Sequence, residues 1–137
     1  MSNLTLLIPA KFESECLPIF LKELEKFNYK KVVIVDESDF KTIEAAKKFD
    51  DVNIFYQKKN GYGNALIEGI NNTQTEFFSI INADGSMNPN ELSGMMDTIN
   101  KENSDFVFGS RYMNNSGSED DDLTTTIGNF GFSLIVS

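Results

Sequence analysis

The chain has 137 residues, of which 40% are hydrophobic and 24% are charged, a composition that is ordinary for one soluble globular domain. Acidic residues outnumber basic ones by 21 to 12, so the net charge is −9, and this argues against a nucleic-acid-binding protein, whose phosphate contacts need clustered Lys and Arg. The sequence has no histidine and one cysteine, Cys16, which excludes imidazole-based catalysis, an imidazole metal site and an internal disulfide.

Five short apolar runs predict β-strands, because they are rich in β-branched or aromatic residues and are bounded by Pro, Asp, Gly or Asn. The first, second and fourth runs are nearly continuous in apolar residues, which is typical of strands that are covered on both faces in a parallel sheet. The five predicted strands are residues 4–8, 31–35, 52–56, 77–81 and 105–109.

Two of the segments between these runs carry apolar residues at helical spacing. One is marked by Leu17, Phe20, Leu21, Leu24 and Phe27, and the other by Leu92, Met95, Met96 and Ile99. The second helix has a predicted start, with Asn88 as N-cap, Pro89 at the first helical position and Glu91 at the capping-box position. The alternation of strands and helices predicts an α/β fold, a three-layer sandwich with a mainly parallel sheet.

The last part of the chain, residues 113–137, is predicted to be separate from the sheet. Residues 114–122 (NNSGSEDDD) are typical of a solvated acidic loop, and residues 123–137 predict the start of a further apolar helix. Because a natural domain seldom ends on apolar residues such as Leu134, Ile135 and Val136, we expect the chain to be a truncated piece of a longer protein. The early residues lack a secretory signal, no apolar run is long enough to cross a bilayer, and one cysteine fits a reducing compartment, so we predict a cytoplasmic protein.

Polar residues follow each predicted strand, and in open α/β sheets ligands bind beyond the carboxyl ends of the strands. Since the carboxyl ends of parallel strands meet at one edge, we expect these residues to form one site. They are Pro9, Lys11 and Glu13; Asp36, Glu37, Ser38 and Asp39; Lys58, Lys59, Asn60, Gly61 and Gly63; Asn82, Asp84, Gly85 and Ser86; and Gly109, Ser110, Arg111 and Tyr112.

These clusters fit a nucleotide, although each has a plainer interpretation. Asp36 and Glu37 suit the donor groups of a base or the hydroxyls of a ribose, and Arg111 suits a phosphate. Asp84, with an amide nearby, suits a divalent cation that neutralises a diphosphate, and oxygen ligands favour Mg²⁺ or Mn²⁺ over Zn²⁺. Asp39 or its neighbour Ser38 can equally be an N-cap, Asp84 can be a turn residue, NGYG can be a plain turn, and the lysines can be solvated charges.

Taken together, the segments IPAKFESE, VVIVDES, KKNGYGNALIEGI, NADGS and FGSRY resemble the family 2 glycosyltransferases of GT-A fold. Within that family they are most similar to the dolichyl-phosphate mannose synthase and polyprenyl-phosphate sugar transferase group. The resemblance runs from Leu4 to Tyr112, and it implies a nucleotide-sugar-binding GT-A domain over residues 1–112.

The resemblance also implies three sets of site residues. The metal site would consist of Asp84, Asn82 and Ser86, and the catalytic residues would be Asp84 and Arg111. The nucleotide-sugar site would comprise Pro9, Ala10, Glu13, Asp36, Glu37, Asn60, Gly61, Gly63, Asn82, Ala83 and Asp84.

Three positions depart from the family pattern. Phe12 stands where Asn is usual, Tyr62 where Lys is usual, and Asn82 where the metal motif Asp-x-Asp has its first Asp. The change at Asn82 removes one negative charge and predicts weaker cation binding. The loop after Glu37 is also one residue shorter than in the family.

The function that the resemblance implies is inverting glycosyl transfer of the hexosyltransferase type, in cell-envelope glycan biosynthesis. A sugar would move from a UDP-sugar or GDP-sugar to a lipid-phosphate or glycan acceptor with the help of Mg²⁺ or Mn²⁺. The protein would act in the cytoplasm or at the cytoplasmic face of the membrane, and a homodimer is compatible with this function.

Two alternatives stay open. One is a non-catalytic nucleotide-binding domain or truncated donor-binding fragment, which the neutral side chain of Asn82 favours. The other is a receiver-like signalling domain, suggested by the acidic pair Asp36 and Glu37. A receiver also needs a phospho-acceptor Asp after the next strand, where this chain has Gln57 followed by two lysines.

Overall fold

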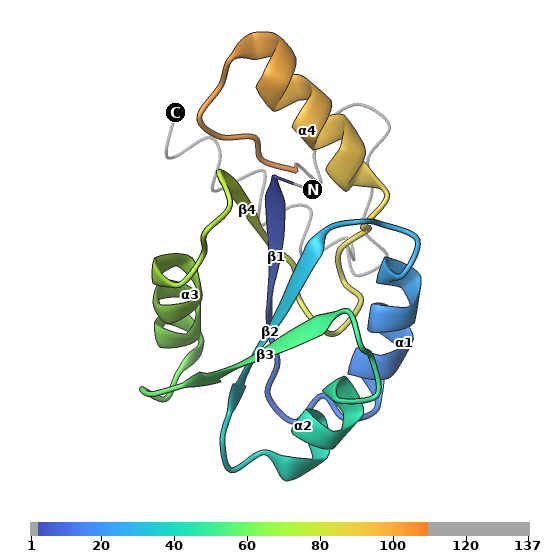
Figure 1. The fold of residues 1–137 in the computed structure, drawn as a ribbon, viewed down its shortest axis with the longest axis vertical. Helices are drawn as coiled ribbons and strands as arrows, with labels where there is room; N and C mark the ends of the chain where they lie inside the picture. Colours follow the sequence, from blue (N-terminus) through green and yellow to red (C-terminus); the bar gives the residue numbers. More distant parts are fainter. Residues whose placement is uncertain (1–2, 110–137) are drawn as a thin grey trace, which may run out of the picture. The chain divides into compact units, whose positions relative to one another are not determined.

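Four strands form one parallel sheet. The computed structural model describes residues 3–109 and contains β1 (Leu4–Pro9), β2 (Lys30–Asp36), β3 (Val52–Gln57) and β4 (Phe77–Ile80). The strand order is β3-β2-β1-β4, and β1 pairs in parallel with both β2 and β4. The chain therefore winds outward from β1 to β3 and then returns to the other side of β1 (Figure 1), which places a topological switch point between β1 and β4.

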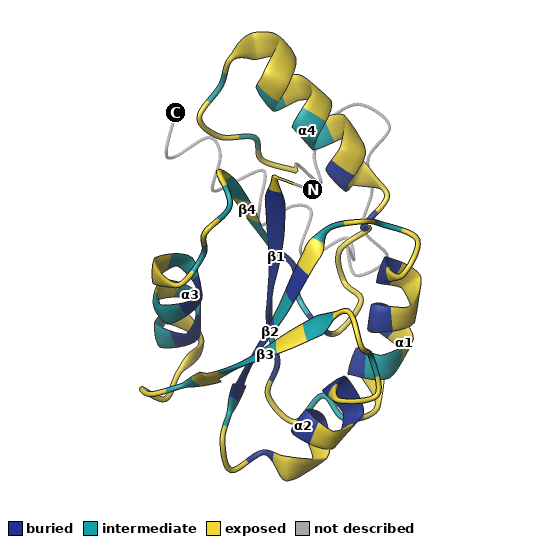
Figure 2. Cartoon of the chain, viewed as in Figure 1, coloured by how far each residue is buried: buried dark blue, intermediate teal, exposed yellow. Residues whose placement is uncertain are grey.

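Helices cover both faces of this sheet. Helices α1 (Cys16–Leu24) and α2 (Phe40–Ala46) lie on one side, and α3 (Tyr62–Asn71) lies on the other (Figure 1). Leu6, Leu7 and Ile8 of β1 are each 1% exposed or less, as residues of a strand that is covered on both faces must be (Figure 2). The predicted α/β sandwich of three layers with a parallel sheet is confirmed.

Helix α1 follows the predicted spacing but ends earlier. Leu17, Phe20, Leu21 and Leu24 are buried. The chain leaves the helix after Leu24 because the turn tightens there: the Phe27 N–H donates to the Leu24 carbonyl oxygen at 3.1 Å, an i to i−3 bond. The sequence pattern predicts Phe27 within the helix, whereas the structure has it in the following turn.

Helix α3 approaches the sheet closely at Gly69. A Cβ atom at this position would lie 2.4 Å from Ile34 Cδ1 and 3.5 Å from Leu7 Cδ2. Ala65, one turn earlier, is buried with Leu7 and Ile34 in the same apolar cluster. Small residues on this face of α3 therefore set the distance between the helix and the strands β1 and β2.

The chain divides at Asn90, so α4 (Glu91–Glu102) belongs to a second unit. The sequence predicts that this helix begins at Pro89, but it begins at Glu91. The Asn88 side chain closes the turn before it, with Oδ1 accepting from the backbone N–H of Asn90 at 3.1 Å. Asparagine favours such a local turn for the same reason that it favours N-caps.

The fifth predicted strand, residues 105–109, is wrong. These residues form no strand within the described part of the chain. Phe106 and Phe108 are exposed and stack on each other, with ring centroids 6.3 Å apart. The run therefore lacks the buried face and the paired neighbour that hold a short strand in a sheet.

Within residues 3–109, no helix is long and apolar enough to cross a membrane. The predicted boundary at residue 113, with the acidic loop and further helix beyond it, lies outside the described residues.

Candidate functional site

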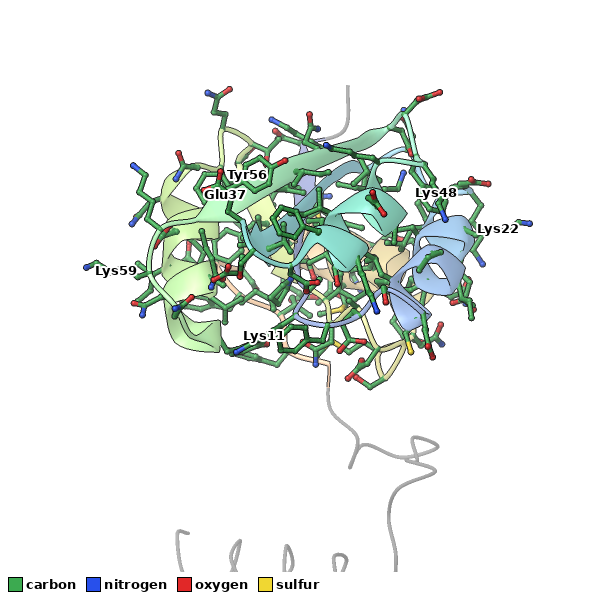
Figure 3. The ribbon with its side chains drawn as sticks, turned by 90° about the horizontal axis from the view of Figure 1, so that it is seen from below. Lys11, Lys22, Glu37, Lys48, Tyr56 and Lys59 are labelled. Atoms are coloured by element: carbon green, nitrogen blue, oxygen red, sulfur yellow. The ribbon has the colours of Figure 1, made fainter. Side chains whose placement is uncertain are left out.

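A cavity of about 220 Å³ lies at the carboxyl ends of the strands and spans the switch point between β1 and β4. Figure 3 looks onto this edge and labels Lys11, Glu37 and Lys59, which follow β1, β2 and β3. The cavity lies where an open α/β sheet is expected to bind a ligand. Eight of the predicted nucleotide-sugar residues line it, namely Pro9, Ala10, Glu13, Asp36, Gly61, Asn82, Ala83 and Asp84.

The other predicted residues do not line the cavity. Glu37, Asn60 and Gly63 each adjoin a lining residue in the chain. Ser86 is hydrogen-bonded to Asp84. Arg111 lies outside the described residues.

Two hydrogen bonds attach the loop after β1 to the start of α2. The Phe12 N–H donates to Asp39 Oδ2 at 2.7 Å, and the Glu13 N–H donates to Thr42 Oγ1 at 3.1 Å. Asp39 is also the N-cap of α2, since its Oδ1 accepts from the Thr42 N–H at 3.3 Å. The N-cap interpretation of Asp39 is therefore confirmed, and the residue has a second contact that the sequence does not show.

Asp36 is the last residue of β2 and lines the cavity. Its Oδ1 accepts from the Ser38 hydroxyl and from the Ser38 N–H, the latter at 2.9 Å. These two hydrogen bonds, the side-chain bond first, lower the pKa of Asp36, and the charge of Lys11 adds to the effect. The side chain is therefore an anion at neutral pH, an acceptor for the N–H groups of a base or the hydroxyls of a ribose.

The loop after β3 is tied to α3 by a single carboxylate. Glu68 accepts from the backbone N–H of Lys58 at 2.7 Å and from that of Lys59 at 3.0 Å. Gly61 then forms the N-cap of α3 with φ of 111°, a conformation that L-residues with a side chain rarely adopt. This fixed loop brings Gly61 and Tyr62 to the cavity wall.

The loop after β4 brings a third carboxylate to the cavity, beside those of Glu13 and Asp36. Asp84 Oδ1 accepts from the Ser86 N–H at 2.9 Å across Gly85, which has φ of 75°. The side-chain and backbone hydrogen bonds of Ser86 lower the pKa of Asp84, so this group too is an anion at neutral pH. Asp84 is thus both a turn residue and part of the cavity wall.

Tyr62 and Asn82 contact each other across the cavity. The Tyr62 hydroxyl donates to Asn82 Oδ1 at 3.1 Å. This contact joins the start of α3 to the loop after β4 and occupies one side of the amide oxygen that the sequence assigns to a metal. Asn82 is therefore a weaker candidate ligand than Asp84.

The oxygen donors of residues 82–86 fit a cation that a diphosphate helps to hold. Mg²⁺ is commonly bound through one or two carboxylates together with substrate phosphates. Asp84 supplies one such carboxylate, and residues 3–109 contain no cluster of three or more Asp, Glu, Cys or His side chains that could hold a metal. The residues present suit a metal–diphosphate pair and not a cation held by protein groups alone.

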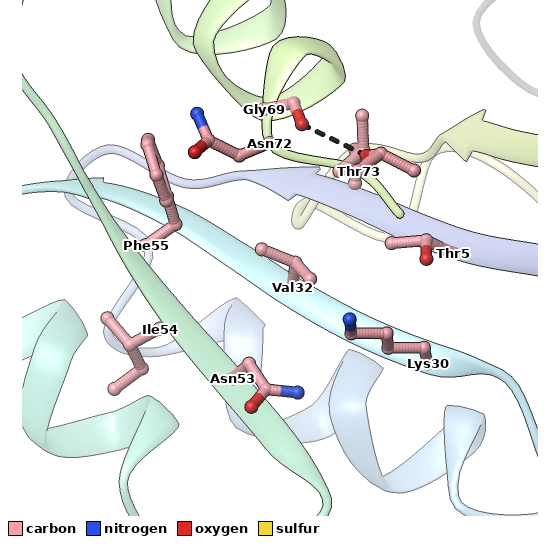
Figure 4. A pocket seen from close by; sticks show the side chains of 10 residues that line it. Thr5, Lys30, Val32, Asn53, Ile54, Phe55, Gly69, Asn72 and Thr73 are labelled. Atoms are coloured by element: carbon pink, nitrogen blue, oxygen red, sulfur yellow. Dashed lines mark hydrogen bonds between the residues drawn. The ribbon is translucent and has the colours of Figure 1, made fainter. Parts of the chain in front are cut away.

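A second cavity, of about 190 Å³, lies on the α3 side of the sheet (Figure 4). It is bounded by Thr73, whose hydroxyl donates to the Gly69 carbonyl oxygen at 3.0 Å, and by side chains of β2 and β3. Among the described residues, Lys30 is its one charged lining residue, and none of the predicted site residues in that range lines it. The carboxyl-edge cavity therefore remains the candidate site.

Four residues that line that cavity are not among the predicted site residues, namely Ile34, Gln57, Tyr62 and Ala65. Gln57 is the last residue of β3 and lies in register with Asp36 of β2. Its position directly at a strand end is a signal that the sequence offers, but the predicted strand stops one residue short. Ile34 and Ala65 are apolar and carry no comparable signal.

Comparison with known proteins supports a family assignment. Residues 5–135 match the model of glycosyl transferase family 2. An uncharacterized protein of Methanocaldococcus jannaschii is 31% identical over 132 residues, which covers 93% of this chain and 54% of that protein. The UDP-N-acetylglucosamine–dolichyl-phosphate N-acetylglucosaminyltransferase of Methanococcus voltae is 25% identical over 151 aligned positions, covering 95% of this chain and 60% of the relative.

A third relative is also named as a glycosyltransferase. An uncharacterized glycosyltransferase of Rickettsia typhi is 31% identical over 100 residues, covering 72% of this chain and 31% of the relative. The chain spans little more than half the length of the two archaeal relatives. The parallel sheet, the polar loops at its carboxyl edge and the match over residues 5–135 agree, and the chain belongs to glycosyl transferase family 2.

Proposed function

We propose that this chain binds the nucleoside diphosphate of a UDP-sugar or GDP-sugar in the carboxyl-edge cavity, as the donor-binding part of an inverting glycosyltransferase. The observation that carries the proposal is that loops from four strand ends bring their predicted residues to one cavity at the switch point. Membership of the family supports sugar transfer. The relative from M. voltae is named for a UDP-sugar and dolichyl phosphate, which favours this donor and a lipid-phosphate acceptor.

The nucleoside is assigned to the β1, β2 and β3 ends of the cavity. The ionised Asp36 accepts hydrogen bonds from a base or ribose, and Gln57 beside it offers both a donor and an acceptor. Lys11 and Glu13 close the cavity from the loop after β1. This arrangement presents donors and acceptors together, as the polar edge of a base requires.

The diphosphate is assigned to the β4 end of the cavity. Asp84 would hold Mg²⁺ or Mn²⁺ together with the phosphate oxygens, and Asn82 would stand beside it, held by the Tyr62 hydroxyl. When bound, the cation neutralises the charge of the leaving diphosphate. Arg111, outside the described residues, is proposed to face a second phosphate.

The reaction needs no general base if the acceptor is a lipid phosphate. An acceptor oxygen would form a bond to C1 of the sugar while the bond from C1 to the diphosphate oxygen breaks, and the nucleoside diphosphate would leave with inversion at C1. The acceptor phosphate is already ionised, so no proton has to be removed. Such an acceptor would bring the protein to the cytoplasmic face of a membrane.

A second candidate is a nucleotide-binding module without turnover. The observation that favours it is Asn82, a neutral amide whose oxygen already accepts the Tyr62 hydroxyl. In that case the cavity would bind a nucleotide through its nucleoside contacts, and a metal ion would add little.

Calorimetric titration with UDP and with GDP, each with and without Mn²⁺, tests the proposal. The variant Asp84→Ala removes the cavity carboxylate that is assigned to the metal ion, and the matched control Asp50→Ala removes an exposed carboxylate before β3, at the opposite edge of the sheet. We expect Mn²⁺ to tighten binding of one nucleotide by about tenfold or more, because a divalent cation between a carboxylate and a diphosphate gains at least about 1.4 kcal/mol. Asp84→Ala should abolish this gain and Asp50→Ala should preserve it.

Two other outcomes would change the assignment. If the nucleotide affinity depends on neither Mn²⁺ nor Asp84, the result supports the nucleotide-binding module without turnover. If neither nucleotide binds to the wild-type chain, the proposed donor site is wrong.

A further inference from the structure

We propose that Asp39 is a positioning residue for the nucleotide site, which acts through the loop after β1 in addition to capping α2. The inference rests on the proposed function and extends it to a residue that does not line the cavity. Asp39 is 6% exposed, and its two carboxylate oxygens have different partners. Oδ1 accepts from the Thr42 N–H at 3.3 Å, within the first turn of α2, and Oδ2 accepts from the Phe12 N–H at 2.7 Å, 27 residues earlier in the chain than Asp39.

Phe12 needs such an external partner because its backbone is in the left-handed region. Its φ is 60°, a conformation that places the Cβ of an L-residue close to its own backbone and that is rare for bulky side chains. Burial of the phenyl ring does not compensate, since Phe12 is 78% exposed. The Lys11 ammonium lies 5.6 Å from the centroid of the exposed ring, and the hydrogen bond from the Phe12 N–H to buried Asp39 is the contact that holds the backbone of Phe12 itself.

A second hydrogen bond continues the attachment. The Glu13 N–H donates to the hydroxyl of Thr42 at 3.1 Å, and Thr42 is fully buried. Two consecutive backbone N–H groups of the loop are thus bound by the first turn of α2. We call this arrangement of Asp39, Thr42 and the N–H groups of residues 12 and 13 the loop clamp.

The loop clamp determines where two charged residues of the cavity lie. Lys11 and Glu13 flank Phe12 and both line the cavity, whereas Phe12 and Asp39 do not. Released from Asp39, Phe12 would return to a right-handed or extended conformation, and the directions of its neighbours would change with it. A nucleotide would then have to order the loop on binding, which weakens its affinity.

The variant Asp39→Ser separates the two roles of this side chain. Serine is a good N-cap and retains the bond to the start of α2, but its single oxygen on a shorter side chain cannot also reach the Phe12 N–H. We expect thermal stability to change little, hydrogen exchange of the Phe12 amide to become about tenfold faster or more, and the nucleotide dissociation constant to rise about tenfold.

A rescue variant distinguishes positioning from general damage. Glycine adopts positive φ without cost, so adding Phe12→Gly to Asp39→Ser should recover part of the lost nucleotide affinity without restoring the bond to residue 39. Should Asp39→Ser fail to fold, Thr42→Val, which removes the acceptor of the Glu13 N–H, should raise the dissociation constant in the same direction.

The outcomes separate this inference from the function on which it rests. The positioning role is overturned if Asp39→Ser folds and the hydrogen exchange of its Phe12 amide is unchanged. It is also overturned if the loss of nucleotide affinity follows the melting temperature and Phe12→Gly does not rescue it. Both results leave the proposed donor site intact. If the wild-type chain binds neither UDP nor GDP, the proposed function fails and the positioning role fails with it.

Discussion

Asp36 and Asp84 each accept hydrogen bonds from the serine two residues later in the chain. In both cases Oδ1 accepts the serine N–H at 2.9 Å, so the Asp-x-Ser pattern after β2 is repeated after β4. The serine donors favour the charged form, which lowers the pKa of Asp36 and of Asp84 below the ordinary value of 3.8. Local turns thus keep these two of the cavity's carboxylates ionised, at the two strand ends where a nucleoside and a diphosphate are proposed to bind.

The variant Ser86→Ala should raise the pKa of Asp84 toward 3.8, because the side-chain donor is the first cause of its depression. A depressed pKa stabilises the fold above the ordinary value of 3.8, and this contribution is lost as the pH falls through the folded pKa. Titration of the carboxyl carbons by NMR measures the change. Ser38→Ala is the matched control, which should raise the pKa of Asp36 and leave Asp84 unaltered; equal shifts of both carboxyls in either variant would contradict the account.

At the scale of the elements, the distance between α3 and the sheet depends on Gly69. An added methyl group would meet Ile34 Cδ1 at 2.4 Å, and Ile34 is itself 1% exposed, so its side chain has little room to move. Gly63, in the first turn of the same helix, has no neighbouring atom within 4 Å of the place that a methyl group would take, and it tolerates one. Close packing therefore requires glycine at position 69 but not at position 63.

We expect Gly69→Ala to lower the free energy of unfolding by about 1 kcal/mol, since overpacking costs about 1–3 kcal/mol and alanine returns about 1 kcal/mol of helix propensity. Gly63→Ala should leave stability unchanged or raise it by up to about 1 kcal/mol. Urea unfolding followed by circular dichroism gives both values. A Gly69→Ala variant as stable as Gly63→Ala would mean that α3 does not pack on Ile34 as closely as described.

At the scale of the whole molecule, the sequence predicts what depends on local pattern. The four strands of the sheet follow from apolar runs bounded by turn residues, and their alternation with helices predicts the parallel sheet whose carboxyl edge gathers the polar loops. Eight of the residues that the sequence assigns to the nucleotide-sugar site line the cavity at that edge. The fifth predicted strand is wrong because five residues with strand composition form a strand only when a neighbour pairs with them.

Contacts between distant segments are outside the reach of such patterns. The Tyr62 hydroxyl meets Asn82 across 20 residues, and the Phe12 N–H meets Asp39 across 27. Neither pair has a spacing or a composition that marks it in the sequence. The sequence likewise does not show that Gly69 packs against Ile34. Most residues that line the cavity could therefore be predicted from the sequence, but the contacts that hold its loops could not.

We expect a nucleotide to bind at the carboxyl edge of the sheet and not in the second cavity. Backbone amide shifts in a ¹⁵N-labelled chain, followed during titration with UDP and with GDP in the presence of Mg²⁺, test it most directly. The amides of Lys11, Gly61 and Asp84 should shift with one of the two nucleotides, while those of Asn53 and Asn72 in the second cavity stay unchanged. Shifts that gather at Asn53 and Asn72, or no shift with either nucleotide, would contradict it.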